Sequence, residues 1–373
     1  MFQTRRLSRF VLATGFFALG ACAFIPTDEQ GAATVLSVTP AAPNAAAQRL
    51  PSLQTRRFEL TEPGQELIGE TQLLFTNYEN TFAAIAREYD LGYEELKDAN
   101  PGVDHWLPGE GTPVYLPTLS ILPDAPRVGI VLNLPSMRLL YFSRSELESG
   151  AGVRALVTSH PIGIGREGWA TPTGTAAVTG KARDPVWYVP ASVRAEHSAI
   201  GDPLPSVVPP GPDNPLGRFA IGLSMPGYLI HGTNKPSGVG MRVSHGCIRL
   251  YPEDIEALFG RVPSGTPVSI VDQPVLAGWR GGKLFLEVHR PLAEDERDLL
   301  AEAYRIISAA MERAAKTDLG LDHDAVQTIV AEQRGIPFPV LQSGLTRDQY
   351  LAAARVIENT VPIVAAKTTA RTD

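Results

Sequence analysis

With 373 residues, the chain is long enough for two or more domains. It is 44% hydrophobic and 20% charged, which is the balance of a globular protein. A net charge of −7, without any basic run interleaved with aromatic residues, argues against a nucleic-acid partner.

The first 22 residues have the pattern of an export signal. Arg5, Arg6 and Arg9 precede a short apolar run over 10–21. A membrane span needs about 20 apolar residues, so this run predicts a secretory signal peptide. It ends in "LGAC", which resembles the bacterial lipobox. The resemblance implies that Cys22 is lipidated and anchors the protein in the periplasm, with the outer membrane favoured because Ala23 follows. An ordinary signal peptide with a chance cysteine is the alternative.

The chain has only two cysteines, Cys22 and Cys247. If Cys22 carries lipid, Cys247 cannot pair with it. Exported proteins usually use their cysteines in disulfides. A lone thiol in an oxidising compartment therefore indicates a chemical role for Cys247.

Residues 23–66 are rich in Ala, Pro, Thr and Gln, which predicts a flexible tether. A small module over 67–118 follows. Its pattern predicts a helix over 80–91 with Asn80 as N-cap, a second helix in 92–103 that stops before Pro101, and a strand over 112–117.

This order of helix, helix, "NP" and strand resembles the LysM domain, a small α/β module. The resemblance implies binding of glycan chains that contain N-acetylglucosamine. The usual opening "GDT" is replaced by Glu79-Asn80-Thr81, which puts glycan binding in more doubt than the fold. A plain packing module is the alternative.

Residues 127–272 are predicted to form the main domain, which is rich in strands. Two β-like runs around "NLPS" in 127–142 predict a hairpin. Short strands separated by Gly and Pro predict a β-sandwich or barrel. Pro252, the early acidic residues and Gly260 predict one good helix over 251–262. The other predicted strands are 155–165, 174–182, 228–232 and 266–272.

The remaining segment, 273–373, is predicted to be a helical extension. Apolar residues at helical spacing predict helices over 293–316, 322–335 and 346–360. Whether these helices pack on the strand domain or meet a partner is left open.

The glycines Gly163, Gly165 and Gly168 fit G-x-G-x-x-G after a strand-like run. Pro172 follows where a dinucleotide-binding helix should begin, and a pyrophosphate needs that helix N-terminus. The sequence thus predicts no nucleotide cofactor.

The segment 228–250 holds the densest group of reactive side chains. Cys247 has His231, His245 and Arg249 nearby in sequence. A thiol at pH 7 is only a few per cent thiolate without such help. Three interpretations compete: a cysteine acyltransferase, a zinc site, and a buried structural cysteine. No fourth zinc ligand and no H-x-x-x-H helix is evident, so no metal is predicted.

The pattern "HGT…VSHGCIRLYPEDI" resembles the L,D-transpeptidase catalytic domain, also called the YkuD domain. The resemblance covers about 127–290 and is specific around 231–250, in the branch with "HGCIRL". The gap from His231 to Ser244 is short, at 12 residues, and Arg249 stands where many members have Asn. The resemblance implies a multidomain, mainly β protein whose catalytic domain is a YkuD-like β-sandwich.

Carried over to this chain, the resemblance makes Cys247 the nucleophile and His231 the general base. The carbonyl of Gly232 would orient His231. His245, with the N–H groups of Gly246 and Cys247, would shape the oxyanion site. Spacing alone leaves either histidine possible as the base, and the family favours His231.

Ser244, Gly246 and Arg249 are the predicted substrate-binding residues. A guanidinium such as that of Arg249 can bind a carboxylate bidentately, or it can simply brace the loop. Gly246 would let a substrate carbonyl approach the backbone N–H groups.

The implied reaction starts when Cys247 attacks the carbonyl of diaminopimelate in a tetrapeptide stem and D-alanine leaves. The thioester then passes to another stem's diaminopimelate or to a lysine of an outer-membrane lipoprotein. Water as acceptor would make the protein a carboxypeptidase. The different-class alternative is a non-catalytic, peptidoglycan-binding lipoprotein.

Overall fold

The structure is a computed structural model that describes residues 57–62, 64–146, 153–342 and 346–362. The predicted signal peptide, Cys22 and the first part of the predicted tether lie outside these ranges. Over the described ranges, none of the helices combines the length and hydropathy that a bilayer span requires.

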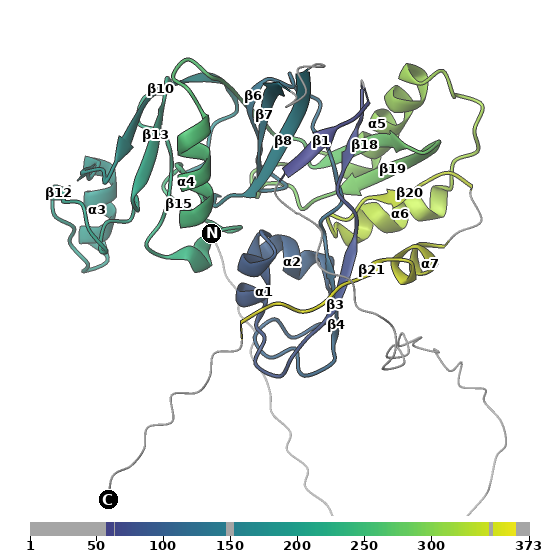
Figure 1. The fold of residues 1–373 in the computed structure, drawn as a ribbon, viewed down its shortest axis with the longest axis horizontal. Helices are drawn as coiled ribbons and strands as arrows, with labels where there is room; N and C mark the ends of the chain where they lie inside the picture. Colours follow the sequence, from purple (N-terminus) through teal and green to yellow (C-terminus); the bar gives the residue numbers. More distant parts are fainter. Residues whose placement is uncertain (1–56, 63, 147–152, 343–345, 363–373) are drawn as a thin grey trace, which may run out of the picture. The chain divides into compact units, whose positions relative to one another are not determined.

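A nine-stranded sheet forms the scaffold of the strand-rich domain (Figure 1). Its neighbours are antiparallel, except for the parallel pairs β6–β17 and β14–β16. The predicted hairpin over 127–142 is confirmed as β6–β7. In spatial order the strands are β1 (Arg57–Leu60), β8 (Val153–Pro161), β7 (Arg138–Glu146), β6 (Gly129–Asn133), β17 (Pro267–Val271), β10 (Gly174–Arg183), β13 (Phe219–Leu223), β14 (Leu229–His231) and β16 (Ile248–Arg249).

The strand β10 joins the two halves of this sheet. Its first residues, Gly174–Ala177, pair with β17, and the register shifts between Val178 and Gly180 before the rest pairs with β13. Such an irregularity bends a strand and lets it change partners. The two layers of the predicted sandwich are therefore two halves of one hydrogen-bonded sheet.

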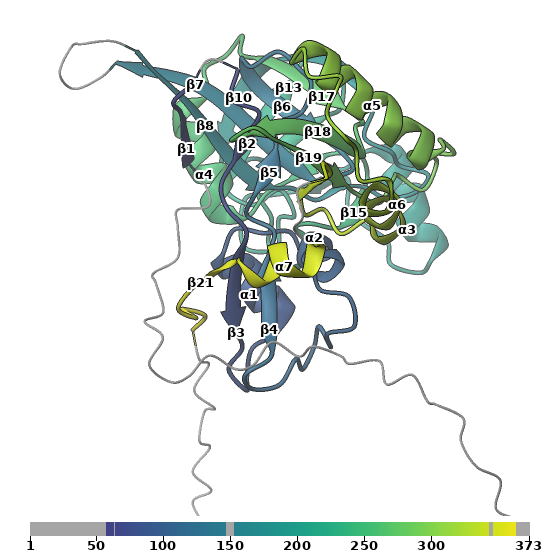
Figure 2. The ribbon, with the colours of Figure 1, turned by 90° about the vertical axis from the view of Figure 1, so that its right-hand side faces the viewer.

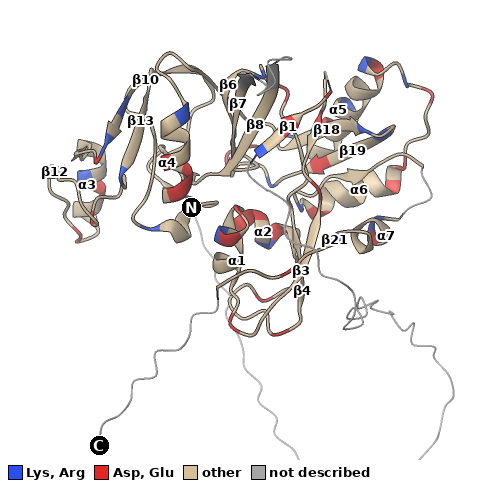
Figure 3. Cartoon of the chain, viewed as in Figure 1, with Lys and Arg blue, Asp and Glu red and all other residues tan. Residues whose placement is uncertain are grey.

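One apolar core lies between the two halves. It combines Ile130 and Leu132 from β6 with Phe219 from β13 and Ile230 from β14. The helix α4 (Pro252–Arg261) closes this core with Ile255 and Leu258. It matches the predicted helix over 251–262, and its acidic first turn and basic last turn complement the helix dipole (Figure 3).

The strand β1 corrects the predicted tether over 23–66. Its four residues pair antiparallel with β8, from Arg57 opposite Thr158 to Leu60 opposite Ala155. The tether pattern misses this strand because the pairing partner is far along the chain. Phe58 and Leu60 pack on the apolar cluster under β7 and β8, so the folded part begins by residue 57.

The small module folds as strand, helix, helix, strand: β3 (Gln72–Phe75), α1 (Phe82–Glu88), α2 (Tyr93–Ala99) and β4 (Pro113–Leu116). The two strands pair antiparallel, and the helices pack on them through a core that includes Leu74, Phe82 and Leu96. The N-cap of α1 is Thr81 rather than the predicted Asn80, since the Thr81 hydroxyl accepts the Ala84 N–H at 3.2 Å.

The segment after residue 272 differs from the predicted helical extension. It begins with a hairpin, β18 (Val275–Arg280) and β19 (Lys283–Val288), to which β20 (Phe338–Pro339) adds. The helices α5 (Leu299–Arg313) and α6 (His323–Glu332) lie against this sheet (Figures 1 and 2). Residues 275–288 hold two short apolar runs on either side of Gly281-Gly282, which is a hairpin pattern that the helical prediction overlooked.

The predicted helix over 346–360 is shorter in the structure. It is α7 (Arg347–Ala352), and the chain then forms β21 (Arg355–Val356), which runs parallel to β3 of the module (Figure 2). Ile357 and Val361 complete the core of the module. The module is therefore closed by residues more than 200 positions later in the sequence.

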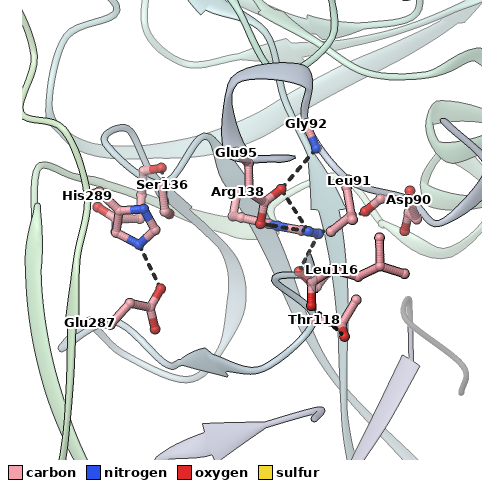
Figure 4. A network of polar contacts seen from close by, with 12 residues as sticks. Asp90, Leu91, Gly92, Glu95, Leu116, Thr118, Ser136, Arg138, Glu287 and His289 are labelled. Atoms are coloured by element: carbon pink, nitrogen blue, oxygen red, sulfur yellow. Dashed lines mark hydrogen bonds and ion pairs between the residues drawn. The ribbon is translucent and has the colours of Figure 1, made fainter. Parts of the chain in front are cut away.

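A buried ion pair joins the module to the nine-stranded sheet (Figure 4). Glu95 of α2 accepts hydrogen bonds from Nε and Nη2 of Arg138 at 2.9–3.0 Å. The same guanidinium donates through Nη1 to the carbonyl of Asp90 and to the hydroxyl of Ser159. Glu95 also accepts the backbone N–H of Gly92, which caps α2.

Candidate active site

A cavity of about 770 Å³ brings five of the predicted site residues together. They come from separate strands and loops: His231, Ser244, His245, Cys247 and Arg249. The helix α3 (Ala191–Ala199) and the short strands β11 (Trp187–Tyr188) and β12 (Val207–Val208) also contribute lining residues.

Parallel pairing of β14 with β16 sets the positions of His231 and Cys247. Ile230 lies opposite Ile248, and His231 lies opposite Arg249. Cys247 immediately precedes β16, while His231 is the last residue of β14. Because the strands run parallel, Cys247 lies beside Leu229 at the start of β14, two residues before His231. Residues two apart on a strand face the same side, so the cysteine and the histidine share one face of the sheet.

His231 is almost completely buried, with 4% of its surface exposed. Its Nδ1 lies 2.6 Å from the carbonyl oxygen of Gly232. Because a carbonyl can only accept, Nδ1 carries the proton and Nε2 keeps a lone pair. Burial, with Arg249 nearby, lowers the pKa of His231 to about 4, against the hydrogen bonds to Gly232 and Leu216 that favour the charged form. The imidazole is therefore neutral near pH 7.

The thiol of Cys247 is also neutral at rest. Burial raises its pKa, and this effect exceeds the opposing influence of the Leu229 backbone and of the positive charge of Arg249. The Sγ atom lies 3.6 Å from the carbonyl oxygen of Gly227. A neutral thiol beside a neutral imidazole needs proton transfer during attack, which is general-base catalysis.

The turn before Cys247 is held by side chains from two directions. The hydroxyl of Ser244 donates to the carbonyl of Cys247 at 2.6 Å and accepts the N–H of Gly246 at 3.2 Å. Thr171 donates to the carbonyl of Gly246 at 2.8 Å. Ser244, a predicted substrate-binding residue, lines the cavity but is only 3% exposed, and its hydroxyl is hydrogen-bonded inside the loop.

The backbone conformation and a close neighbour explain why a glycine occupies position 246. Its φ of +101° is unfavourable for other residues, and an added Cβ would lie 3.0 Å from a ring carbon of Tyr228. Its N–H is engaged by Ser244. The N–H of Gly246 is thus not the oxyanion donor that the sequence predicts in this conformation.

His245 is held by Trp169 and by two residues that the sequence does not single out, Glu196 and Arg166. Its Nε2 lies 2.9 Å from Oε2 of Glu196 and 3.3 Å from Nη2 of Arg166. The ring of Trp169 meets that of His245 edge to face, with centroids 4.9 Å apart. Burial lowers the pKa of His245, and Glu196 counteracts this by favouring the charged form.

Arg249 has its backbone fixed and its guanidinium beside the cavity. Its N–H and carbonyl both pair with Gly163, at 2.9 and 2.8 Å. Over the described part of the chain, its Nε is buried without a hydrogen-bond partner. Burial lowers the pKa of Arg249, while the side chain stays a cation and favours the thiolate of Cys247.

Comparison with known proteins agrees with this geometry. The family model described as "L,D-transpeptidase catalytic domain", YkuD, matches residues 127–270. The chain is 38% identical to the probable L,D-transpeptidase YcfS of Escherichia coli, over 79% of this chain and 91% of the relative. The chain belongs to the L,D-transpeptidase family.

Two further relatives support this membership. The probable L,D-transpeptidase YbiS of Escherichia coli is 38% identical over 75% of this chain and 90% of its own length. The probable L,D-transpeptidase ErfK/SrfK of Salmonella typhimurium is 41% identical over 65% of this chain and 76% of its own length. The alignments thus extend well beyond the catalytic domain.

In this L,D-transpeptidase, the part of the cavity lined by α3 and the loop after it was not predicted from the sequence. α3 lies in a stretch where no helix was expected. The following loop is organised by Asn214, whose side-chain amide donates to the carbonyls of Pro185, Val208 and Pro209 at 2.9–3.3 Å. The Pro- and Gly-rich stretch over 208–217 was the available signal, because such a loop needs a polar side chain to satisfy its backbone.

The described residues contain one group of side chains with the geometry of metal ligands, and it lies outside this cavity. Asp90, His160 and Asp254 place their ligand atoms within 4.8 Å of one another, and all three are buried. His160 Nδ1 is 3.1 Å from Asp254 Oδ1.

Proposed function

We propose that this L,D-transpeptidase acts on peptidoglycan stem peptides through a thioester on Cys247. One observation carries the proposal: Cys247 and His231 line the same cavity, and the Nδ1 of His231 is bound to the Gly232 carbonyl. His231 therefore offers Nε2 as a base. The names of the relatives, all L,D-transpeptidases, support the reaction class.

In the first step, Sγ of Cys247 attacks the carbonyl carbon of diaminopimelate in a tetrapeptide stem. The thiol proton passes to Nε2 of His231. The carbon–sulfur bond forms, the bond to the D-alanine nitrogen breaks, and His231 returns the proton to the departing amine. The carbonyl of Gly232 keeps the imidazole oriented throughout.

Charge on the tetrahedral oxygen is stabilised by preorganised donors. The backbone N–H of Cys247 supplies one donor, since the N–H of Gly246 is used by Ser244. His245 supplies a second donor when its imidazole is protonated, because the neutral ring carries a single N–H. Arg249 binds a carboxylate of the stem peptide, because its side chain lines the cavity beside Cys247 and a guanidinium can pair with a carboxylate bidentately.

In the second step, an amine attacks the thioester and frees Cys247. The acceptor is diaminopimelate of another stem or a lysine of an outer-membrane lipoprotein, and the cavity wall decides between them. Water as acceptor would give an L,D-carboxypeptidase instead.

The location we propose is the periplasmic face of the outer membrane. Lipid on Cys22 would anchor the chain, and the LysM-like module over 67–118 would bind the glycan strands. Two weak attachments raise the local concentration of stem peptides without tight binding of either one.

A direct test uses the chain without residues 1–22, so that Cys247 is its single thiol. The protein is incubated with a disaccharide-tetrapeptide, and intact mass and released D-alanine are measured. A thioester adduct or a cross-linked dimer, together with D-alanine, is expected from the wild type and neither from Cys247→Ala.

The competing function is a wall-binding scaffold without catalysis. It predicts glycan binding with no D-alanine release and no adduct in the same experiment. The product identifies the acceptor: a dimer indicates a second stem, free tripeptide indicates water, and a conjugate with an added lysine peptide indicates a lipoprotein.

A further inference from the structure

One face of α3 presents a carboxylate to the histidine of the SHGC sequence. Glu196, in the middle of α3, contacts His245 Nε2 through Oε2 at 2.9 Å. Its other oxygen, Oε1, accepts from Nη2 of Arg166. About a third of the Glu196 side chain is exposed, so solvent screens this contact only in part.

The surroundings allow His245 little freedom to turn. The indole of Trp169 closes one side of the ring, and the guanidinium of Arg166 lies 6.0 Å from the centre of that indole. The backbone N–H of Arg166 donates to the carbonyl of Ser244, directly before His245. Arg166, Trp169 and Glu196 thus form one contiguous support for the ring.

The distances indicate which ring nitrogen carries the proton. Arg166 Nη2 already donates to Glu196, and it is the more distant neighbour of Nε2, at 3.3 Å. The closer neighbour is the Glu196 oxygen at 2.9 Å, which can only accept. Nε2–H therefore donates to Glu196, and Nδ1 is the nitrogen left for substrate chemistry.

We propose that Glu196 is a positioning residue that fixes the tautomer, orientation and charge of His245 for the acyl-transfer reaction. The inference rests on the proposed function of Cys247. It also assigns a role to α3: this helix lines the cavity and carries Glu196, the residue that orders the SHGC turn. Donor binding against α3 and the readiness of His245 are thereby coupled.

A plain surface ion pair between Glu196 and Arg166 is the alternative. It would contribute little to stability and nothing to the chemistry. The two cases differ in what happens to His245, because only a positioning role makes the imidazole respond to the charge at position 196.

The first experiment is an NMR titration of the histidine rings in the enzyme without substrate. The carboxylate of Glu196 favours protonated His245. In Glu196→Gln, which keeps an acceptor but removes the charge, we expect the pKa of His245 to fall by about 1. We also expect ring nitrogen shifts that show Nε2–H in the wild type. An unchanged pKa, or a neutral ring protonated on Nδ1, overturns the proposal.

The second experiment measures D-alanine release. We expect kcat to fall roughly 10- to 100-fold in Glu196→Ala with KM little changed, a smaller loss in Glu196→Gln, and partial recovery in Glu196→Asp. Glu302→Gln is the matched control, since Glu302 also lies on a helix and pairs with an arginine, Arg305, away from the cavity. Equal kcat in Glu196→Ala and the wild type overturns the proposal.

Thermal unfolding of each variant distinguishes a loss of activity through His245 from a loss caused by misfolding. If Glu196→Ala does not fold, Glu196→Gln and the titration decide the matter. A wild type that releases no D-alanine would refute the proposed function. The titration alone would then test whether Glu196 fixes the tautomer and charge of His245.

Discussion

At Cys247, burial and charge act in opposite directions on the thiol. Burial raises the pKa of the thiol, and the cation of Arg249 moderates the rise. The same cation, with burial, holds the pKa of His231 at about 4. Arg249 therefore favours a thiolate while it disfavours an imidazolium. The pair rests in its neutral form, and the base is available over most of the pH range.

The pH dependence of acylation follows from this neutral pair. Protonation of His231 removes the base, so we expect D-alanine release to lose activity below about pH 4 to 5, rather than near the ordinary histidine value of 6.5. The measurement is kcat/KM against pH, with circular dichroism to confirm folding at each point. A half-point between pH 6 and 7 would show that a preformed thiolate–imidazolium pair is the reactive state.

The same pKa has a consequence for stability. Between pH 6.5 and about 4 the unfolded chain protonates His231 and the folded chain does not. The unfolded state then binds more protons, so stability rises with pH across this window. We expect up to about 3 kcal/mol from this residue, and His231→Gln should remove it from the pH dependence of urea unfolding.

Asp98 contributes the opposite sign and must be separated from this effect. Burial raises its pKa to about 6, so the folded chain binds more protons than the unfolded one between the ordinary value of 3.8 and 6. Stability from Asp98 therefore falls as pH rises through that window. The pH profile of stability is measured for the wild type, for His231→Gln and for Asp98→Asn, which removes the Asp98 contribution. Identical profiles for His231→Gln and the wild type would contradict the expectation for His231.

Arg249 has a charge role that can be tested without substrate. We expect Arg249→Met to raise the pKa of Cys247 further and to slow its alkylation by iodoacetamide near pH 8, because the cation that favours the thiolate is lost. Arg249→Lys keeps the charge and should stay closer to the wild type. Equal alkylation rates for the Met variant and the wild type would show that Arg249 only braces the loop.

Among the elements, α2 has the contact with the largest expected effect on stability. Its Glu95 and the catalytic strand's Arg138 have side chains only 10% and 9% exposed. Removing one partner leaves a buried charge without compensation. Glu95→Ala should cost about 3–5 kcal/mol in urea unfolding.

Glu94, the preceding residue on α2, provides the matched control. It pairs with Lys97 at 3.0 Å on a more exposed face. Glu94→Ala should cost less than about 1 kcal/mol. Equal losses for the two variants would mean that the Glu95–Arg138 pair does not stabilise the junction.

The elements also show what the sequence could predict. Helices with a clear apolar stripe or cap, such as α4 and α5, and strands around turn signals, such as β6 and β7, were predicted correctly. β1 and β21 were missed because each depends on pairing with a distant strand. α3 was missed because only one of its residues, Val193, is buried.

The residues of the candidate site also divide into those that the sequence could predict and those that it could not. Cys247, His231 and Arg249 lie close in sequence and could be grouped there. Glu196 could not, because it approaches His245 from 49 residues away on a helix without a strong pattern. The role of Ser244 could not be fixed from the sequence, because a hydroxyl beside a nucleophile can face either substrate or its own loop.

In the molecule as a whole, the described chain closes on itself through its C-terminal segment. Ile357 is fully buried and Val361 is 4% exposed in the core of the module. The hydroxyl of Tyr89 donates to the carbonyl of Glu358 at 3.0 Å. The module's stability therefore depends on residues that follow the catalytic domain.

This closure predicts a local effect of a core substitution. Ile357→Ala should cost about 2–5 kcal/mol in the module. Because the module's core is separate from that of the nine-stranded sheet, we expect faster amide exchange in α1 and β3 and little change in β6 and β7. Leu319→Ala, at a site 39% exposed, is the control. Faster exchange throughout the chain would show instead that the buried Glu95–Arg138 pair makes the module and the catalytic domain one cooperative unit.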